Sequence, residues 1–222
     1  MLNAKKVSSG KSKSGSKQDA IPAGPYEVRV AQVIDLGLQA QRPYMKEEKP
    51  PANELMITYE FLELFVKDAD GNDDEDKPRW LSETIPLRSL EADKAKSTQR
   101  YYALDPDEDF EGDFTQLVGV PAIANVVTNP GKGQHEGKVF NNIASLNTML
   151  PKLAKIAPDL KNEPKVFDLD EPDMEIFGSL PDWLQDKIKD NLEFKGSVLE
   201  GKLNGTSDEE IDEDIDDEEW ED

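Results

Sequence analysis

The chain has 222 residues and carries 48 Asp and Glu against 26 Lys and Arg, for a net charge of −22. Its length suits one medium-sized domain with appended segments, or two small ones. The absence of cysteine excludes disulfides, thiolate zinc sites and cysteine nucleophiles. No stretch approaches the roughly 18 apolar residues of a membrane-spanning helix, and the first residues lack the apolar core of a signal peptide. We therefore expect a cytoplasmic location and no membrane partner.

The two ends of the chain have opposite charge. Residues 1–20 are rich in Ser, Gly and Lys, and the first eighteen contain five lysines and no acid. Residues 206–222 contain twelve acids and no base. Such compositions predict a disordered basic arm over 1–20 and a disordered acidic tail over 201–222. Charge asymmetry of this kind suggests a polyelectrolyte partner.

The segment 21–150 has the alternating pattern of β-strands. Apolar residues occupy every second position from Tyr26 to Val30, and 53–66 is apolar on both faces, as in a strand covered on both sides. The Pro-rich stretch 42–52 is expected to be a loop, and 67–79 a hairpin tip that leads to a return strand over 79–87. A helix is predicted over 89–104, and two further strands over 117–129 and 138–147, joined by a tight turn.

Five strands with one helix between the third and fourth predict a mainly β, OB-fold-like five-stranded barrel over 21–150. A β-sandwich of the same strands is the alternative. Residues 151–200 form a predicted helical extension packed on the barrel. Its clearest element is a C-terminal helix near 180–191, with Ser179 as its N-cap and apolar residues at helical spacing.

Catalytic and metal-binding motifs are weak. The single histidine, His135, lies in a Gly-rich turn. The loop that begins at Asp68 resembles a calcium loop, but Gly71 stands at its fourth position rather than its sixth. The acids of 105–113 suit a magnesium-dependent nuclease only if they converge. We therefore expect no enzyme activity, no metal and no cofactor.

Aromatic residues interleaved with basic ones are typical of single-stranded nucleic-acid binders, where bases stack on rings and cations contact phosphates. The stacking candidates are Tyr44, Trp80 and Tyr101. The phosphate candidates are Arg29, Arg42, Lys46, Lys49, Arg79, Lys94, Lys96 and Arg100.

The acidic tail resembles nucleic acid in its charge, so it is expected to compete with DNA for a cationic groove and to dock on partner proteins. A tail that only improves solubility has no need of an aromatic residue near its end. The residues assigned to partner binding are Asp212, Asp214, Asp216, Asp217, Glu218, Glu219 and Trp220.

The stretches GPYEVRVAQVIDLGLQ and LMITYEFLE, with LVGVPAIANVVTN, KVFNNIASL and LPDWLQDKI further on, resemble a family of phage-encoded single-stranded DNA-binding proteins over about residues 21–195. The resemblance implies an early protein with an OB-fold that coats single-stranded DNA in replication, recombination and repair, in the cytoplasm of the infected bacterium. It implies tail contacts with a phage polymerase, helicase or nuclease, and a homodimer is an expected assembly. The main alternative is an acidic DNA mimic that binds basic partner proteins.

Overall fold

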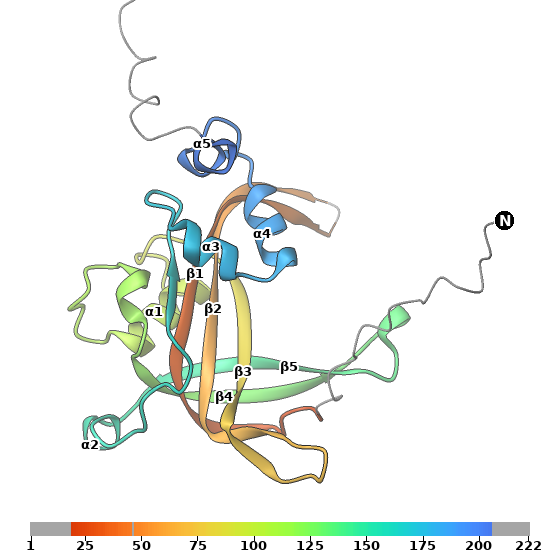
Figure 1. The fold of residues 1–222 in the computed structure, drawn as a ribbon, viewed down its shortest axis with the longest axis vertical. Helices are drawn as coiled ribbons and strands as arrows, with labels where there is room; N and C mark the ends of the chain where they lie inside the picture. Colours follow the sequence, from red (N-terminus) through yellow and green to blue (C-terminus); the bar gives the residue numbers. More distant parts are fainter. Residues whose placement is uncertain (1–18, 46, 206–222) are drawn as a thin grey trace, which may run out of the picture.

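The computed structural model describes residues 19–45 and 47–205 (Figure 1). The chain forms six strands, five α-helices and two short 3-10 helices, η2 and η3, within the described residues. The order is β1 (Gly24–Tyr44), β2 (Glu47–Lys67), β3 (Asp73–Pro86), α1 (Lys96–Leu104), η2 (Phe114–Leu117), β4 (Pro121–Pro130), η3 (Gly133–His135), β5 (Val139–Thr148), α2 (Pro151–Ala154), β6 (Lys165–Phe167), α3 (Met174–Ser179), α4 (Asp182–Lys189) and α5 (Val198–Asn204).

The fold is mainly β, as the sequence predicts. Five strands pair antiparallel in the order β3-β2-β1-β4-β5, and α1 connects β3 to β4. The sheet is open, because no backbone ladder joins β3 to β5 within the described residues. A sixth strand, β6, pairs parallel with β1 through Gln32 to Ile34. The sequence contains no clear signal for β6, which has only three residues.

The expectation of a loop over 42–52 is wrong. β1 and β2 continue through this stretch as a two-stranded hairpin, in which Gln41 lies opposite Lys49 and Tyr44 opposite Glu47. Proline lacks the amide that a strand ladder needs, so it is confined to edges and bulges. Here Pro50 and Pro51 fall in a bulge between two paired positions, and the ladder resumes on either side.

β1 and β2 are covered on both faces, as the apolar pattern of β2 predicts. One face forms the inner core with α1 and β3 to β5, where Tyr59, Phe61 and Tyr101 are buried. The opposite face packs against the C-terminal segment, where Met56 of β2 meets residues of β6, α3, α4 and α5. The two cores explain why β2 is apolar on both faces instead of showing the apolar–polar alternation of a half-exposed strand.

Helix boundaries differ from the predicted ones. The helix expected over 89–104 begins only at Lys96, because the Arg88 amide donates to Ser97 Oγ and the Thr98 hydroxyl donates to the Ser89 carbonyl, which ties the turns before Lys96 to the first turn of the helix. The C-terminal helix begins at Asp182 after Pro181, and Ser179 closes the preceding helix α3 instead of capping α4.

A buried ion pair spans the open edge between β3 and β5. Arg100 of α1, 2% exposed, donates from Nε to Glu83 Oε1 of β3 at 2.7 Å and from Nη2 to the Ile143 carbonyl of β5 at 2.9 Å. Glu83 also accepts hydrogen bonds from Lys96 Nζ at 2.6 Å and Tyr59 Oη at 3.1 Å. One guanidinium therefore holds together two strands that share no ladder.

We expect Arg100→Ala to lower the free energy of unfolding by about 3–5 kcal/mol, because it leaves the buried Glu83 carboxylate without its main partner. Chemical denaturation measures this decrease. The matched control is Arg88→Ala, since the Arg88 side chain is exposed and should change stability by less than about 0.5 kcal/mol. Similar decreases in both variants would contradict the bridging role.

The same pair predicts a pH dependence. Burial acts to raise the pKa of Glu83, but the hydrogen bonds and charges of Arg100 and Lys96 outweigh it and hold the pKa below its ordinary value. The ionised carboxylate therefore stabilises the fold above its unfolded pKa of about 4.3, and this contribution disappears as the pH falls through the lower folded value. We expect Glu83→Gln to be less stable than the wild type at neutral pH and the difference to shrink in acid. The exposed Glu91→Gln should follow the wild type throughout.

Candidate nucleic-acid interface

Two of the sequence-predicted basic residues lie at the described part of the β1–β2 hairpin tip. Arg42 and Lys49 are exposed there on the two paired strands. Tyr44 ends β1, although its side chain lies outside the described part of the structure, as does the whole of Lys46. Met45 forms the turn with a positive φ of 50°. The described part of this projecting tip thus exposes the bases Arg42 and Lys49 together with the acids Glu47 and Glu48.

Trp80 lies on β3 and is 39% exposed. Its Nε1 donates to Glu60 Oε2 of the neighbouring strand β2 at 3.1 Å. This bond fixes the edge of the indole, and the remaining exposure leaves ring surface available to solvent. Arg79, the adjacent residue, is half-buried, and because strand side chains alternate it points to the opposite face of β3. The side chains of Arg79 and Trp80 therefore lie on opposite faces of β3 and do not form one basic–aromatic pair.

Glu60 anchors a segment that crosses the outer face of β2. Besides Trp80, its buried carboxylate accepts from Lys161 N at 2.7 Å and Asn162 Nδ2 at 2.6 Å. Lys161 Nζ also lies 5.6 Å from the centre of the Phe65 ring, a cation–π contact. Part of the outer β2 face is therefore covered by the chain itself, and a ligand meets the sheet at its edge and hairpins instead.

The predicted residues around α1 have other partners. Tyr101 is fully buried, donates to Asp105 Oδ2 at 2.7 Å and accepts from Gly112 N; burial and the Asp105 bond raise the pKa of its hydroxyl to about 12. Arg100 holds the β3–β5 edge, and Lys96 pairs with Glu83. Lys94 is exposed. Tyr101 and Arg100 thus belong to the core and we leave them out of the interface. Figure 1 places α1 on the opposite side of the long strands from the two projecting hairpins.

Arg29 has a structural role as well. Its guanidinium donates to the carbonyl oxygens of Gly119, Ala157 and Pro158 at 2.6–2.9 Å, and Asp159 lies 3.6 Å away. It therefore fastens the segment after α2 to β1, and we leave it out of the interface too.

Sequence reasoning predicted the two strands of the β4–β5 hairpin but named none of its residues as candidates; we call residues 127–140 of this hairpin the arm. The predicted strands, 117–129 and 138–147, agree with β4 and β5 within one residue at the turn, and the structure adds that they project as a long hairpin (Figure 1). Lys132 and Lys138 are exposed on it, and Phe140 is exposed beside His135, with ring centres 5.7 Å apart. The sequence did contain a signal for a nucleic-acid contact here, because this stretch has two lysines and a phenylalanine beside a single acid, Glu136.

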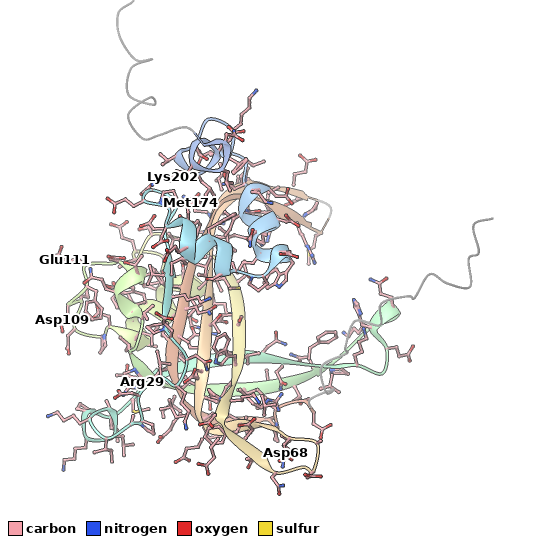
Figure 2. All side chains as sticks on the ribbon, viewed as in Figure 1. Arg29, Asp68, Asp109, Glu111, Met174 and Lys202 are labelled. Carbon is pink, nitrogen blue, oxygen red and sulfur yellow. The ribbon has the colours of Figure 1, made fainter. Side chains whose placement is uncertain are left out.

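The acidic loops lie elsewhere. Figure 2 shows Asp68 at the tip of the β2–β3 hairpin, and Asp109 and Glu111 in the loop after α1, both away from the tip of the arm. In that loop Asp105 accepts from the amides of Asp109 and Phe110, and Asp113 caps η2 through Thr115 N. Two of the clustered carboxylates, Asp105 and Asp113, therefore stabilise the conformation of the loop. Within 19–45 and 47–205, no group of three His, Cys, Asp or Glu side chains is placed to hold a metal ion.

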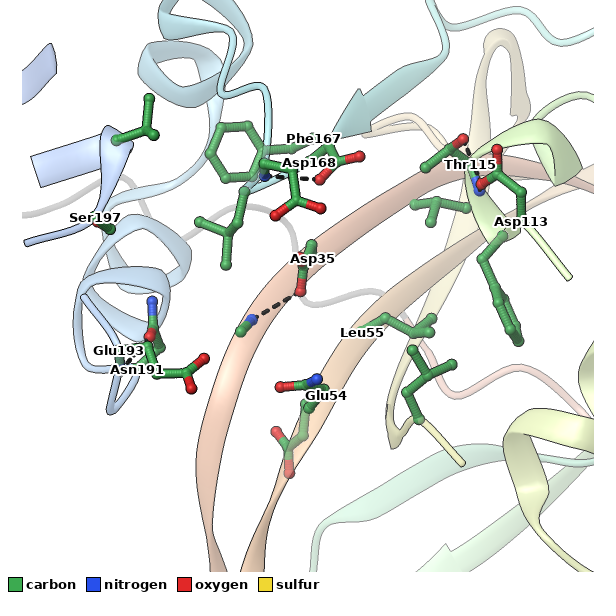
Figure 3. A pocket seen from close by; sticks show the side chains of 18 of the residues that line it. Asp35, Glu54, Leu55, Asp113, Thr115, Phe167, Asp168, Asn191, Glu193 and Ser197 are labelled. Atoms are coloured by element: carbon green, nitrogen blue, oxygen red, sulfur yellow. Dashed lines mark hydrogen bonds between the residues drawn. The ribbon is translucent and has the colours of Figure 1, made fainter. Parts of the chain in front are cut away.

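A cavity of 630 Å³ lies between β1, β2 and the C-terminal segment (Figure 3). Burial raises the pKa of Asp35 in its wall, the Gly37 amide bond acts in the opposite direction, and the charge of Asp168 adds to the increase. The wall also contains other carboxylates, namely Glu54, Asp113, Asp170 and Glu193. This concentration of negative charge disfavours a phosphate backbone, so the cavity is separate from the candidate interface.

No family model, curated protein or solved structure matches the chain. Among the described helices, none has the length and apolar character needed to cross a bilayer.

The Glu60 anchor makes a prediction for local stability. We expect Glu60→Ala to speed hydrogen exchange at the amides of Lys161 and Asn162 about tenfold or more, because hydrogen bonds to a charged acceptor contribute about 1.5–3 kcal/mol. Exchange followed by mass spectrometry measures it. Glu63→Ala, an exposed position on the same strand, is the control, and an unchanged rate in Glu60→Ala would contradict the anchoring role.

Proposed function

We propose that the chain is a non-catalytic protein that binds single-stranded DNA without sequence specificity. One observation carries this proposal. The β1–β2 hairpin and the arm both project past β3 on the same side of the molecule (Figure 1); the hairpin exposes Arg42 and Lys49, and the arm exposes Lys132, Lys138 and Phe140. In OB-folds, the hairpins equivalent to these two, after strands one and four, flank the surface that binds oligonucleotides.

Charge supports the same surface. Residues 19–205 carry 36 acids and 21 bases, but the arm has Lys132 and Lys138 against Glu136 alone. The described chain also begins beside the arm, where Asn141 of β5 bonds both the amide and the carbonyl of Ile21, at 2.8 and 2.7 Å. The five lysines of residues 1–18 precede this point in the sequence, and in our proposal they add sequence-independent phosphate contacts to those of the arm.

The proposed mode of binding combines two contacts. Bases stack on the exposed rings of Trp80 and Phe140, and each stacked base contributes about 1–3 kcal/mol. Phosphates contact Lys132 and Lys138 on the arm and Arg42 on the β1–β2 hairpin. Stacking has no base preference because every base presents a flat ring face, which is why this combination yields binding without specificity.

The remaining expectations belong to the same proposal. In this proposal the fold is a closed, OB-like barrel, in which side-chain contacts of α1 and Arg100 take the place of a backbone ladder between β3 and β5. The phage family suggested by sequence resemblance supplies the setting, namely replication, recombination and repair in an infected bacterium. The tail residues assigned to partner proteins and to competition with DNA lie outside the described residues.

The experiment is fluorescence anisotropy of a labelled oligo-dT titrated with full-length protein. We expect Lys132→Glu/Lys138→Glu to weaken binding about tenfold or more at low salt. It should also reduce the slope of log K against log salt by about 0.7 for each phosphate that the variant no longer binds. The matched control is Lys152→Glu/Lys155→Glu, which makes the same charge change on and just after α2 and should bind like the wild type.

A second pair of variants tests stacking. Trp80→Leu is expected to weaken binding about 5–150-fold, the equivalent of one stacked base. Trp183→Leu should have no effect, because Trp183 is exposed on α4 beside Asp182 and Asp186 rather than on the β3 edge. Absence of oligo-dT binding by the wild type at low salt would overturn the proposal and favour the acidic interaction protein.

A further inference from the structure

A short helical segment exposes three large aliphatic side chains. Leu150 is 68% exposed, Leu153 41% and Ile156 78%. Helical hydrogen bonds run beyond α2, since Ala154 N–H donates to Leu150 O and Ala157 N–H donates to Leu153 O, each at 2.9 Å. Residues three apart in such a turn lie on one side of it. These three side chains therefore form a continuous apolar stripe.

The stripe is held in place at both ends. Met149, immediately before it, is buried, and the carbonyls of Ala157 and Pro158 after it accept hydrogen bonds from Arg29 of β1. Between these anchors α2 projects from the body of the protein (Figure 1). A firmly attached segment that displays its apolar side to solvent is typical of an interaction surface.

Charge specifies the partner. Lys152 and Lys155 are exposed on the same short segment, where they alternate in sequence with the aliphatic residues, and no acid occurs from Met149 to Pro158 in this strongly acidic chain. We call Leu150, Lys152, Leu153, Lys155 and Ile156 the α2 patch. It is complementary to an acidic peptide that carries a few apolar residues.

The chain contains such a peptide. Residues 206–222 hold twelve acids and no base, with Ile211, Ile215 and Trp220 as their apolar residues. We propose that the α2 patch binds residues 206–222 of a second copy of the chain. Position favours a second copy over the tail of the same chain, because α5, after which the described chain ends, and α2 lie toward opposite ends of the long axis (Figure 1).

This inference goes beyond the proposed function and does not depend on it. The α2 patch is on neither of the two hairpins, so tail binding there leaves the proposed DNA surface accessible. Chains joined in this way associate head to tail, an arrangement that continues from copy to copy unless it closes into a ring.

The test is sedimentation velocity of the full-length protein, without DNA, over a range of concentrations. We expect self-association that weakens with salt and is inhibited by a synthetic peptide of residues 206–222. Lys152→Glu/Lys155→Glu and Leu153→Ser/Ile156→Ser should each reduce the association constant about tenfold or more. The arm variant Lys132→Glu/Lys138→Glu, which makes the same charge change, should associate like the wild type.

A mixing experiment tests the pairing directly. Ile211→Ser/Ile215→Ser/Trp220→Ser keeps the patch but alters the tail, and Lys152→Glu/Lys155→Glu keeps the tail but alters the patch. Each variant alone should remain monomeric, and an equimolar mixture should form a heterodimer. A wild type that is monomeric throughout, a mixture without heterodimer, or association abolished only in the arm variant would each overturn the proposal. The last result would place the tail on the proposed DNA surface.

Discussion

The buried pair of Arg100 and Glu83 is the interaction on which the architecture depends. The five antiparallel strands form an open sheet whose edges, β3 and β5, share no ladder within the described residues. Arg100 donates to both edges, and Thr148 of β5 adds a bond to the Ala103 carbonyl at the end of α1. The helix thereby sets the position of β5, and with it the arm, relative to β3. A hydrophobic substitute could fill the same volume, but it would not fix this geometry by directional bonds.

Both faces of β1 and β2 are packed, which limits where a ligand can contact the sheet. Their inner face forms the main core, and their outer face is covered by the C-terminal segment and by the stretch anchored at Glu60. Little of the sheet face remains accessible near β2. In the proposed function, the part of the sheet that remains for DNA is therefore the exposed side of β3 with the two hairpins.

Sequence patterns predicted most of the strands, because alternate burial along a strand produces an alternation of apolar and polar residues in the sequence. They also predicted the helix between the third and fourth strands, though not its start. They failed where one pattern has two physical causes. Arg100 and Tyr101 resemble a phosphate-and-stacking pair, but the same residues also suit a buried bridge, and only the position of Glu83 across the sheet distinguishes the two. The strands of the arm were predicted, but its exposed residues were not chosen as candidates, because glycine and proline indicate a turn without indicating how far its strands project.

Net charge is a poor guide to a local surface. Screening at physiological salt limits the interaction between exposed charges to about 8 Å. The acidic β2–β3 tip and the loop after α1 are separated from the tip of the arm (Figure 2), so they act mainly on long-range steering rather than on contacts made there. An acidic body therefore slows the approach of a polyanion without abolishing a basic contact surface. In the proposed function it also favours a first encounter through the Lys-rich residues 1–18, since the described chain that follows them begins beside Asn141 at the base of the arm.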